Sequence, residues 1–200
     1  MHPNSIFHWQ DREELRAFVT AQRFGMIFMQ TAEGPAVAHV PMLWLDSGRI
    51  GFHLSRGNRL VPHIDGARVL IVVNGPHAYV SPDWYGLEDQ VPTWNYVAAE
   101  LEGEVCAMAP EGLPALIDAL SQDNEERLAP KPVWKRDKMT PGLFDRMTGA
   151  IIGYEMRVTD WRGTRKLGQN KSAEARERAA ASLSAVGDEA IAALMRGTLP

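Results

Sequence analysis

The sequence predicts an α+β protein, built on an antiparallel β-barrel with flanking helices. Between residues 24 and 108 the β segments follow one another through short, turn-forming connections. They do not alternate with helices of about 10 to 15 residues, as the strands of a parallel sheet would. Helical patterns flank this run. Because 200 residues suffice for one core, we expect a single domain over 1–200 with a C-terminal helical segment at about 172–197.

The first element is a helix predicted from about residue 11 to 22. Asp11 and Glu14 have the spacing of a capping box, in which each side chain satisfies a free amide at the start of a helix. An apolar stripe on one helical face follows, formed by Leu15, Phe18 and Val19.

Three apolar segments separated by short turn-forming sequences then predict an antiparallel meander, at 24–31, 36–45 and 49–55. Alternation in the second segment places Val37 and His39 on one face and Ala38 and Val40 on the other. Both faces are largely apolar, so we expect this strand to be covered on both sides.

The remaining segments predict more strands and three helices. Residues 56–66 allow one helical turn after the Gly57–Asn58 corner, and further strands are expected at 67–75, 77–81, 93–108 and 150–161. Apolar spacing predicts a helix from Pro110 to about Asn124 and C-terminal helices that break near Gly187. We expect Pro76, Pro82 and Pro92 to interrupt strand pairing, which leaves the aromatic residues between them in loops or at strand ends.

Composition excludes several classes of protein. The net charge is −4, and Lys and Arg cluster only at 131–138 and 165–171, so direct DNA binding is disfavoured. The apolar runs are strand-sized, far from the ~20 residues that a membrane helix needs. The first residues lack the pattern of a secretory signal, and Cys106 is alone, so we expect a cytoplasmic protein without a disulfide.

Familiar catalytic and nucleotide-binding motifs are missing. The sequence has no P-loop, no G-x-G-x-x-G and no G-x-S-x-G, and its six His residues show no metal-ligand spacing. We therefore assign no catalytic residue and expect no metal site.

A candidate anion site is the stretch FHLSRGN at 52–58. Strand alternation places His53 and Ser55 on one face, and Arg56 and Asn58 follow at the corner. An imidazole, a hydroxyl, a guanidinium and an amide can all donate hydrogen bonds to phosphate oxygens. The alternative is a polar strand edge exposed to water.

Two further segments combine ring or polar groups. The aromatic segments at 72–85 and 91–96 either plug a barrel mouth or form the wall of a flat ligand, with polar tips from Tyr79, Ser81, Trp94, Asn95 and Tyr96. The stretch RKLGQNK at 165–171 is either a solvated loop or a ligand grip made by Lys166, Gln169, Asn170 and Lys171.

The order of AHVPMLWL, FHLSRGN, GPHAYVSPDWY, VPTWNY, AIIGYEMRVT and KLGQNKS resembles the PaiB-type FMN-binding negative transcriptional regulators over essentially the whole chain. The resemblance implies a split β-barrel of the pyridoxamine-phosphate-oxidase-like type. It also implies a homodimer with FMN in a groove at the subunit interface. The cofactor-binding residues expected on this basis are His39, His53, Ser55, Arg56, Asn58, Tyr79, Ser81, Trp94, Tyr96, Lys166, Gln169 and Asn170.

Within this resemblance, the corner is expected to hold the phosphate, whereas Trp94, Tyr96 and the Lys166–Asn170 loop wall the isoalloxazine. The chain departs from the family pattern H-x-A-R-A-N-P at Ser55, Gly57 and Arg59, and it has Gly168 where KLSQN has Ser. These changes add one charge at Arg59 and one hydroxyl at Ser55, and remove one hydroxyl at Gly168.

The resemblance implies a flavin-binding dimer that regulates transcription indirectly, since the last helix offers one terminal Arg where a recognition helix needs several. One alternative is a flavin-dependent oxidoreductase acting on a small molecule. Another is a haem-binding or haem-degrading split-barrel protein with His39, His63 or His77 as the iron ligand.

Overall fold

The computed structural model describes residues 2–197, which form two compact units. Unit 1 comprises the residues up to Ala17, Val73–Glu100 and the residues from Trp161 onward. Unit 2 comprises Phe18–Val72 and Leu101–Asp160. The expectation that residues 1–200 behave as a single domain stays a prediction.

Seven strands form one sheet in the order β1-β7-β4-β3-β2-β5-β6, and a further pairing of β7 with β6 closes it into a ring. The pairings of β1 with β7, β2 with β3 and β5, and β4 with β3 and β7 are antiparallel. The strands are β1 His8–Trp9, β2 Phe24–Thr31, β3 Gly34–Trp44, β4 Ile50–Ser55, β5 Arg68–Val80, β6 Thr93–Ala107 and β7 Ile151–Lys166. The predicted α+β fold on an antiparallel barrel is confirmed.

One helix precedes β2, a short one lies between β4 and β5, two lie between β6 and β7, and two follow β7. They are α1 Arg12–Gln22, α2 Val61–Ile64, α3 Gly112–Glu126, α4 Leu143–Thr148, α5 Ala173–Ala185 and α6 Glu189–Arg196. Single 3-10 turns occur at η1 Ser5–Phe7, η2 Pro82–Tyr85 and η3 Arg136–Lys138. The sequence did not predict β1, α4 or the 3-10 turns.

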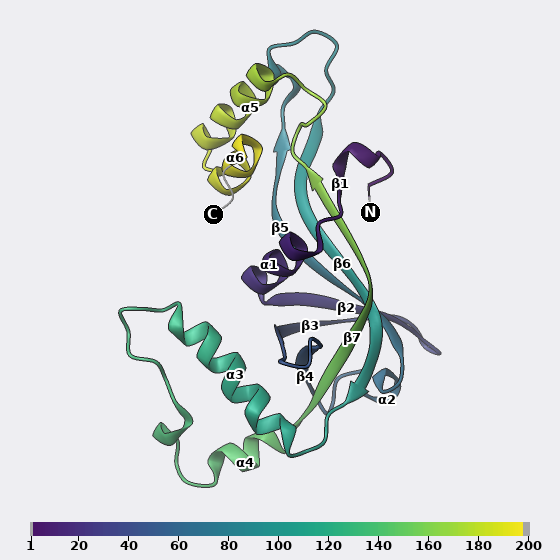
Figure 1. Ribbon diagram of the computed structural model, residues 1–200, viewed down its shortest axis with the longest axis vertical. Helices are drawn as coiled ribbons and strands as arrows, with labels where there is room; N and C mark the ends of the chain where they lie inside the picture. The colour runs from purple at the N-terminus through teal and green to yellow at the C-terminus, as the bar shows by residue number, and fades with distance from the viewer. Residues whose placement is uncertain (1, 198–200) are drawn as a thin grey trace. The chain divides into compact units, whose positions relative to one another are not determined.

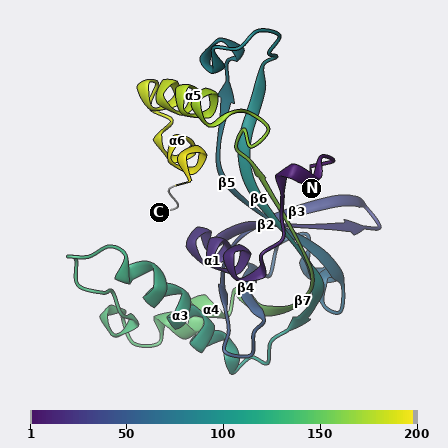
Figure 2. The same ribbon diagram turned by 45° about the horizontal axis from the view of Figure 1, so that its top comes forward.

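In unit 2, α3 buries one apolar face made of three leucines, and Figure 2 shows this helix and α4 in the same part of the unit. Leu113, Leu116 and Leu120 pack with half-buried side chains of β3, β7 and nearby loops. The approach to β4 is so close that a Cβ on Gly51 would lie 2.8 Å from the Leu116 side chain. The helical spacing of the leucines thus produces the predicted packing.

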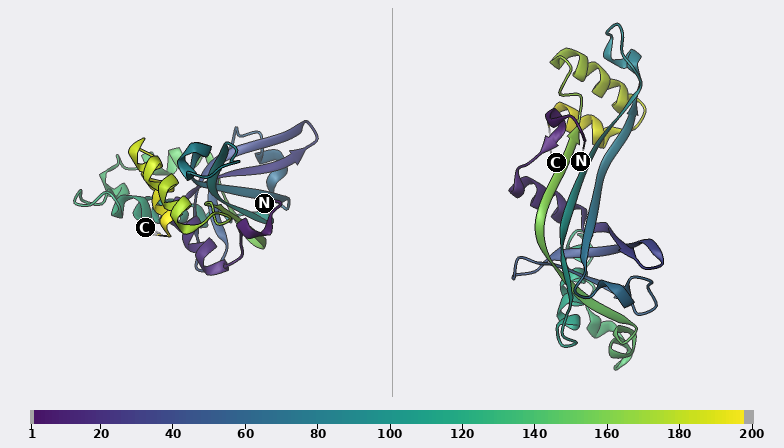
Figure 3. Two further views of the ribbon diagram at one scale, coloured as in Figure 1. Left: turned by 90° about the horizontal axis from the view of Figure 1, so that it is seen from above. Right: turned by 90° about the vertical axis from the view of Figure 1, so that its right-hand side faces the viewer.

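In unit 1, α5 and α6 pack against each other beside β5 and β6 (Figure 1). The two helices are joined at Gly187, which has a φ of +93° and so ends α5 in a left-handed turn, as predicted. Figure 3 shows β5 and β6 running together to the η2 turn, where Arg178 of α5 donates to the Tyr85 carbonyl at 2.5 and 3.0 Å. These bonds fix the aromatic segment to the C-terminal helices.

Two expectations about strands are wrong. In β3 the Ala38 and Val40 face is buried, but Val37 and His39 are exposed, so only one face is covered within this chain. Pro76 lies inside the 13-residue strand β5 instead of interrupting it. A proline has a backbone φ compatible with a strand and removes only one donor, which does not end a strand of this length.

Candidate functional site

The predicted anion corner lies in unit 2, where β4 ends and the chain turns toward α2. Phe52 and Leu54 are buried, whereas His53 is half-buried and Ser55 exposed, as the alternation predicted. Phe52 stacks on Tyr154 of the neighbouring strand β7, with ring centroids 5.6 Å apart and planes 20° apart. The polar residues of the corner therefore lie on, or directly after, a strand that is packed against its neighbour.

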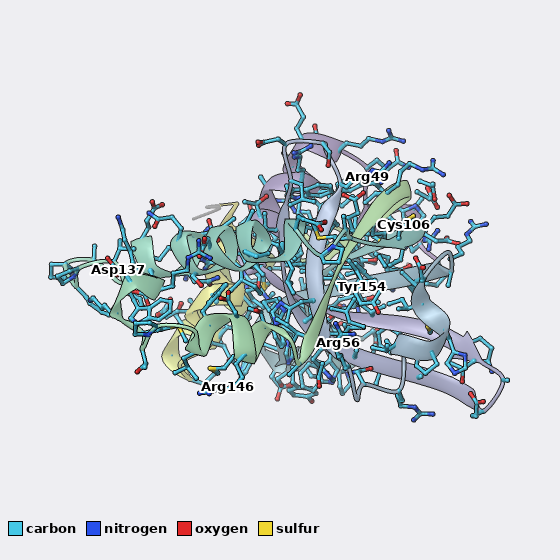
Figure 4. The ribbon with its side chains drawn as sticks, turned by 90° about the horizontal axis from the view of Figure 1, so that it is seen from below. Arg49, Arg56, Cys106, Asp137, Arg146 and Tyr154 are labelled. Atoms are coloured by element: carbon cyan, nitrogen blue, oxygen red, sulfur yellow. The ribbon has the colours of Figure 1, made fainter. Side chains whose placement is uncertain are left out.

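Arg56 is held in place by the segment that precedes β7. Its backbone amide donates to the Ala150 carbonyl at 2.9 Å, and its Nε donates to the Gly149 carbonyl at 2.7 Å. In Figure 4 the Arg56 side chain lies near Tyr154, a residue of β7. Its two terminal nitrogens have no hydrogen-bond or ion-pair partner within residues 2–197, so the guanidinium is positioned while two of its donor groups stay free.

Asn58 shapes the turn and keeps one donor group. Its backbone amide donates to the Ser55 carbonyl at 2.8 Å, and its Oδ1 accepts from the Leu60 amide at 3.0 Å. In the described part of the chain, neither the Asn58 Nδ2 nor the Ser55 hydroxyl has a partner. Both side chains thus offer donors from a fixed backbone.

His53 supplies the strongest indication of a ligand at the corner. Its Nδ1 is buried and has no hydrogen-bond partner among the described residues. Burial lowers the pKa of His53, because the charged imidazolium is poorly solvated there. A buried polar atom without a partner is costly, so a bound acceptor would stabilise it.

Together, the four side chains of the corner suit a phosphate group. His53, Ser55, Arg56 and Asn58 lie within six positions of the chain, and Ser55, Arg56 and Asn58 each have a free donor group. The unpaired His53 Nδ1 adds a further donor in the tautomer that carries its proton there. A phosphate needs several such donors, and an arginine is its usual charged partner. The residues present therefore fit the phosphate of a mononucleotide.

The aromatic residues predicted as a ring wall lie in unit 1, on β5 and β6. The Trp94 ring centroid is 6.2 Å from that of Tyr79 and 6.0 Å from that of His77. Tyr79 is 45% exposed and Trp94 55% exposed, whereas Tyr96 and Ser81 are half-buried. Exposed aromatic side chains that contact one another form an open surface for a flat partner.

The third predicted group, the loop after β7, borders a cavity of about 330 Å³ in unit 1. Lys166 and Asn170 line this cavity, and the Lys166 ammonium donates to the Thr93 hydroxyl. Burial lowers the pKa of Lys166. Gln169 instead shapes the loop, because its Oε1 accepts from the Leu167 amide at 2.8 Å and its Nε2 donates to the Arg165 carbonyl at 2.5 Å.

The three histidines considered as haem ligands have different surroundings. His39 is exposed and stacks on Phe24 with centroids 6.3 Å apart, and His63 lies 3.2 Å from a Glu33 carboxylate oxygen. His77 belongs to the other unit, beside Trp94. Within residues 2–197 no group of three or more His, Cys, Asp and Glu side chains has a metal-binding arrangement.

The structure thus divides the predicted residues between the two units. Unit 2 holds His39, His53, Ser55, Arg56 and Asn58. Unit 1 holds Tyr79, Ser81, Trp94, Tyr96, Lys166, Gln169 and Asn170.

Sequence reasoning did not assign Tyr85, Asp89, Gln90 and Thr93, all of which line the unit 1 cavity. Their only signal was the density of polar and aromatic residues between 81 and 96.

Similar solved structures define the class of fold. The FAD and haem binding protein from Mycobacterium smegmatis superposes with a TM-score of 0.60 at 16% identity, covering 90% of this chain and 80% of that one. The flavocytochrome Anf3 from Azotobacter vinelandii gives a TM-score of 0.58 at 16% identity, covering 84% of this chain and 73% of that one. The fold is therefore the split β-barrel shared with flavin-binding proteins.

The sequence itself then places the chain in a family. Residues 1–160 match the family described as "Putative FMN-binding domain", and the chain belongs to this family. FMN is the cofactor that this membership gives it. The protease synthase and sporulation protein PAI 2 of Bacillus subtilis (strain 168) is 28% identical over 176 residues, which cover 86% of this chain and 84% of the relative. No helix among the described residues has the length and apolar character required to cross a bilayer.

Proposed function

We propose that the protein binds FMN through the corner of unit 2 and regulates transcription indirectly as a homodimer. The observation that carries the proposal is the buried, unpartnered His53 Nδ1, next to free donors of Ser55, Arg56 and Asn58. Bound FMN would supply one- and two-electron chemistry. The residues of this chain hold its phosphate, which fixes the cofactor without entering the redox step.

The resemblance assigns Trp94 and Tyr96 of unit 1 to the isoalloxazine, and this assignment is a proposal separate from that of the corner. Tyr79 and Trp94 expose ring faces and edges that a flat heterocycle can stack against, and Tyr96 follows on the same strand.

The proposed dimer uses an exposed apolar face of unit 2, which we call the β2–β3 face. It consists of Phe24, Met26, Phe28, Val37 and His39, with Phe28 paired opposite Val37. Phe24 is 53%, Phe28 39% and Val37 40% exposed, and the face contains no Asp, Glu, Lys or Arg. A second copy of this uncharged face is a matching partner, since clustered exposed apolar side chains are typical of subunit interfaces.

The C-terminal helices support indirect regulation. Arg196 is the basic residue of α6, and its Nε donates to Glu177 at 2.9 Å while its Nη1 donates to Ser184 at 3.2 Å. The other end of α6 begins with Glu189. A recognition helix needs several free donors toward bases and phosphates, so we propose that DNA is not contacted by α6.

The B. subtilis relative carries the name of a protease synthase and sporulation protein, which agrees with a regulatory role for this chain. A regulator of transcription works beside the chromosome, so the proposal places the protein in the cytoplasm. A partner protein would then respond to whether FMN is bound or to its redox state.

The test of the corner is a titration of purified protein with FMN, followed by the visible absorbance and fluorescence of the flavin. Arg56→Ala and Asn58→Ala should each raise the Kd about tenfold or more, because each removes a donor to a charged phosphate. Arg146→Ala is the matched control: this exposed arginine of unit 2 lies outside the corner, and its loss should leave the Kd unchanged. Equal affinity of wild type and both corner variants would overturn the assignment.

A further inference from the structure

The unit 1 cavity has the chemistry of a second ligand site, built from other residues than the phosphate corner. It measures about 330 Å³ and lies in the part of the molecule formed by η1, the η2 loop, the start of β6 and the loop after β7. Its lining residues are His2, Phe7, Tyr85, Asp89, Gln90, Val91, Thr93, Asn95, Lys166, Gly168, Asn170 and Lys171.

Two ammonium groups face this cavity without a carboxylate partner in the described residues. Lys166 donates to the Thr93 hydroxyl, and Lys171 donates to the Gln90 side-chain oxygen. Both acceptors are neutral, so neither positive charge is neutralised by its hydrogen bond. The only acidic side chain in the lining is Asp89, which leaves the cavity with an excess of one positive charge when His2 is neutral.

The cavity also has a buried polar floor. Asn95 is 1% exposed and Tyr85 2% exposed, and the two side chains share a hydrogen bond. Burial raises the pKa of Tyr85, with an opposing contribution from this bond, so the phenol keeps its proton at neutral pH. The Asn95 Nδ2 also donates to the Met195 sulfur at 3.2 Å, and a thioether sulfur is a weak acceptor.

Apolar side chains complete the lining and limit the kind of ligand. Phe7, Val91 and the Tyr85 ring offer carbon surface next to the ammonium groups. Lys171 lies over the Tyr85 ring, with its Nζ 5.4 Å from the ring centroid. A ligand with an anionic head and a small apolar body matches this combination better than an inorganic ion does.

We propose that the unit 1 cavity binds a small organic carboxylate, with Lys166 and Lys171 on the carboxylate and Phe7, Tyr85 and Val91 around its apolar body. This site is additional to the proposed phosphate site, because the donors of the phosphate corner are other residues, in unit 2. The resemblance assigns Lys166 and Asn170 to FMN, so the test also asks whether FMN occupies the cavity.

The cavity is connected to the C-terminal helices by two of its floor residues. Asn95 contacts Met195 of α6, and the Tyr85 carbonyl accepts from Arg178 of α5. A ligand that orders Tyr85 and Asn95 therefore also stabilises the packing of α5 and α6. Slower amide hydrogen exchange in α5 and α6 is the expected sign of binding.

The experiment is isothermal titration calorimetry with benzoate, using benzamide and inorganic phosphate as matched probes. Benzamide keeps the ring and removes the charge, whereas phosphate keeps the charge and removes the ring. The variants are Lys166→Met and Lys171→Met, with Lys135→Met, an exposed lysine of unit 2, as the control. Thermal melting of each variant shows whether it is folded.

Benzoate should bind the wild type, with affinity reduced about tenfold or more in each cavity variant that folds and unchanged in Lys135→Met. It should also bind equally well to protein saturated with FMN and to Arg56→Ala, which separates this site from the proposed flavin site. Displacement of benzoate by FMN would overturn the separate site. Equal binding of benzamide or phosphate, no benzoate binding by wild type, or unchanged affinity in Lys166→Met and Lys171→Met would overturn the proposed chemistry.

Discussion

At the scale of single residues, His53 of the proposed phosphate site should also make the stability of unit 2 depend on pH. Its Nδ1 is buried without a partner in the described residues, and burial lowers its pKa. The unfolded chain, with a pKa near the usual value for His, therefore binds a proton more readily than the folded chain. Protonation at mildly acidic pH favours unfolding, so the free energy of unfolding should fall as pH drops below about 6.5.

Replacing His53 with Gln should remove part of this pH dependence. Between pH 7.5 and 5.5 the free energy of unfolding should decrease less in His53→Gln than in the wild type, because the variant has no group to protonate there. Urea denaturation at several pH values measures the difference. His77→Gln, which changes an exposed histidine, serves as the control and should follow the wild type.

Gly168 explains one departure from the family pattern at the residue scale. Its φ is +79°, in the left-handed region that side chains other than glycine adopt at a cost. A Cβ at this position would lie 3.8 Å from the Tyr85 hydroxyl, so the neighbouring side chains leave room for one. The glycine is required here by the backbone conformation of the turn that leads to Lys171.

Gly168→Ser restores the family's residue and should nevertheless lower the free energy of unfolding by about 1–2 kcal/mol. The comparison variant is Gly57→Ala, whose added Cβ would meet open space and whose φ is not in the left-handed region. That variant should stay within about 0.5 kcal/mol of the wild type. Chemical denaturation of both proteins measures the difference, and equal stabilities would contradict the assigned strain.

At the scale of elements, α3 depends on its buried leucines more than on its intrinsic helix preference. Leu116 is 2% exposed and lies against β4 at Gly51. Leu116→Ala should lower the free energy of unfolding by about 2–5 kcal/mol, because it removes apolar contacts and leaves a cavity. Ala115→Ser, at an exposed position of the same helix, should change it by less than about 0.5 kcal/mol in the same denaturation experiment.

The elements that could be predicted are those with a strong local pattern. The capping spacing of Asp11 and Glu14 gave α1 within one residue, and the leucine spacing gave α3 within two. By contrast, α4 has six residues and β1 two, too short for a periodic pattern to stand out. The continuation of β5 through Pro76 depends on tertiary packing, which the local sequence does not show.

The same distinction applies to the sites. The corner could be predicted because its four residues lie within six positions of the chain, on an alternating strand and the turn after it. The unit 1 cavity could not be assembled from the sequence. Lys166 and Thr93 are 73 positions apart, and only the folded chain joins them.

At the scale of the whole molecule, the exposed β2–β3 face shows why a second subunit is expected. The sequence predicted that both faces of β3 would be covered, and within one chain only one is. The prediction was based on apolar residues on both faces, and the structure does place apolar side chains on both. The proposed second copy of the chain would account for the difference, because it would bury the face that Phe28 and Val37 leave open.

Phe28→Glu should therefore convert the protein from a dimer to a monomer. Two carboxylates brought together in an apolar interface are poorly solvated and repel each other. Sedimentation velocity measures the mass, and Val186→Glu, at a more exposed apolar position between α5 and α6, should leave the dimer intact. If FMN lies at the subunit interface, the monomeric variant should also bind FMN more weakly although its corner is unchanged. A wild type that sediments as a monomer, or a dimer that withstands Phe28→Glu, would show that the β2–β3 face serves another partner.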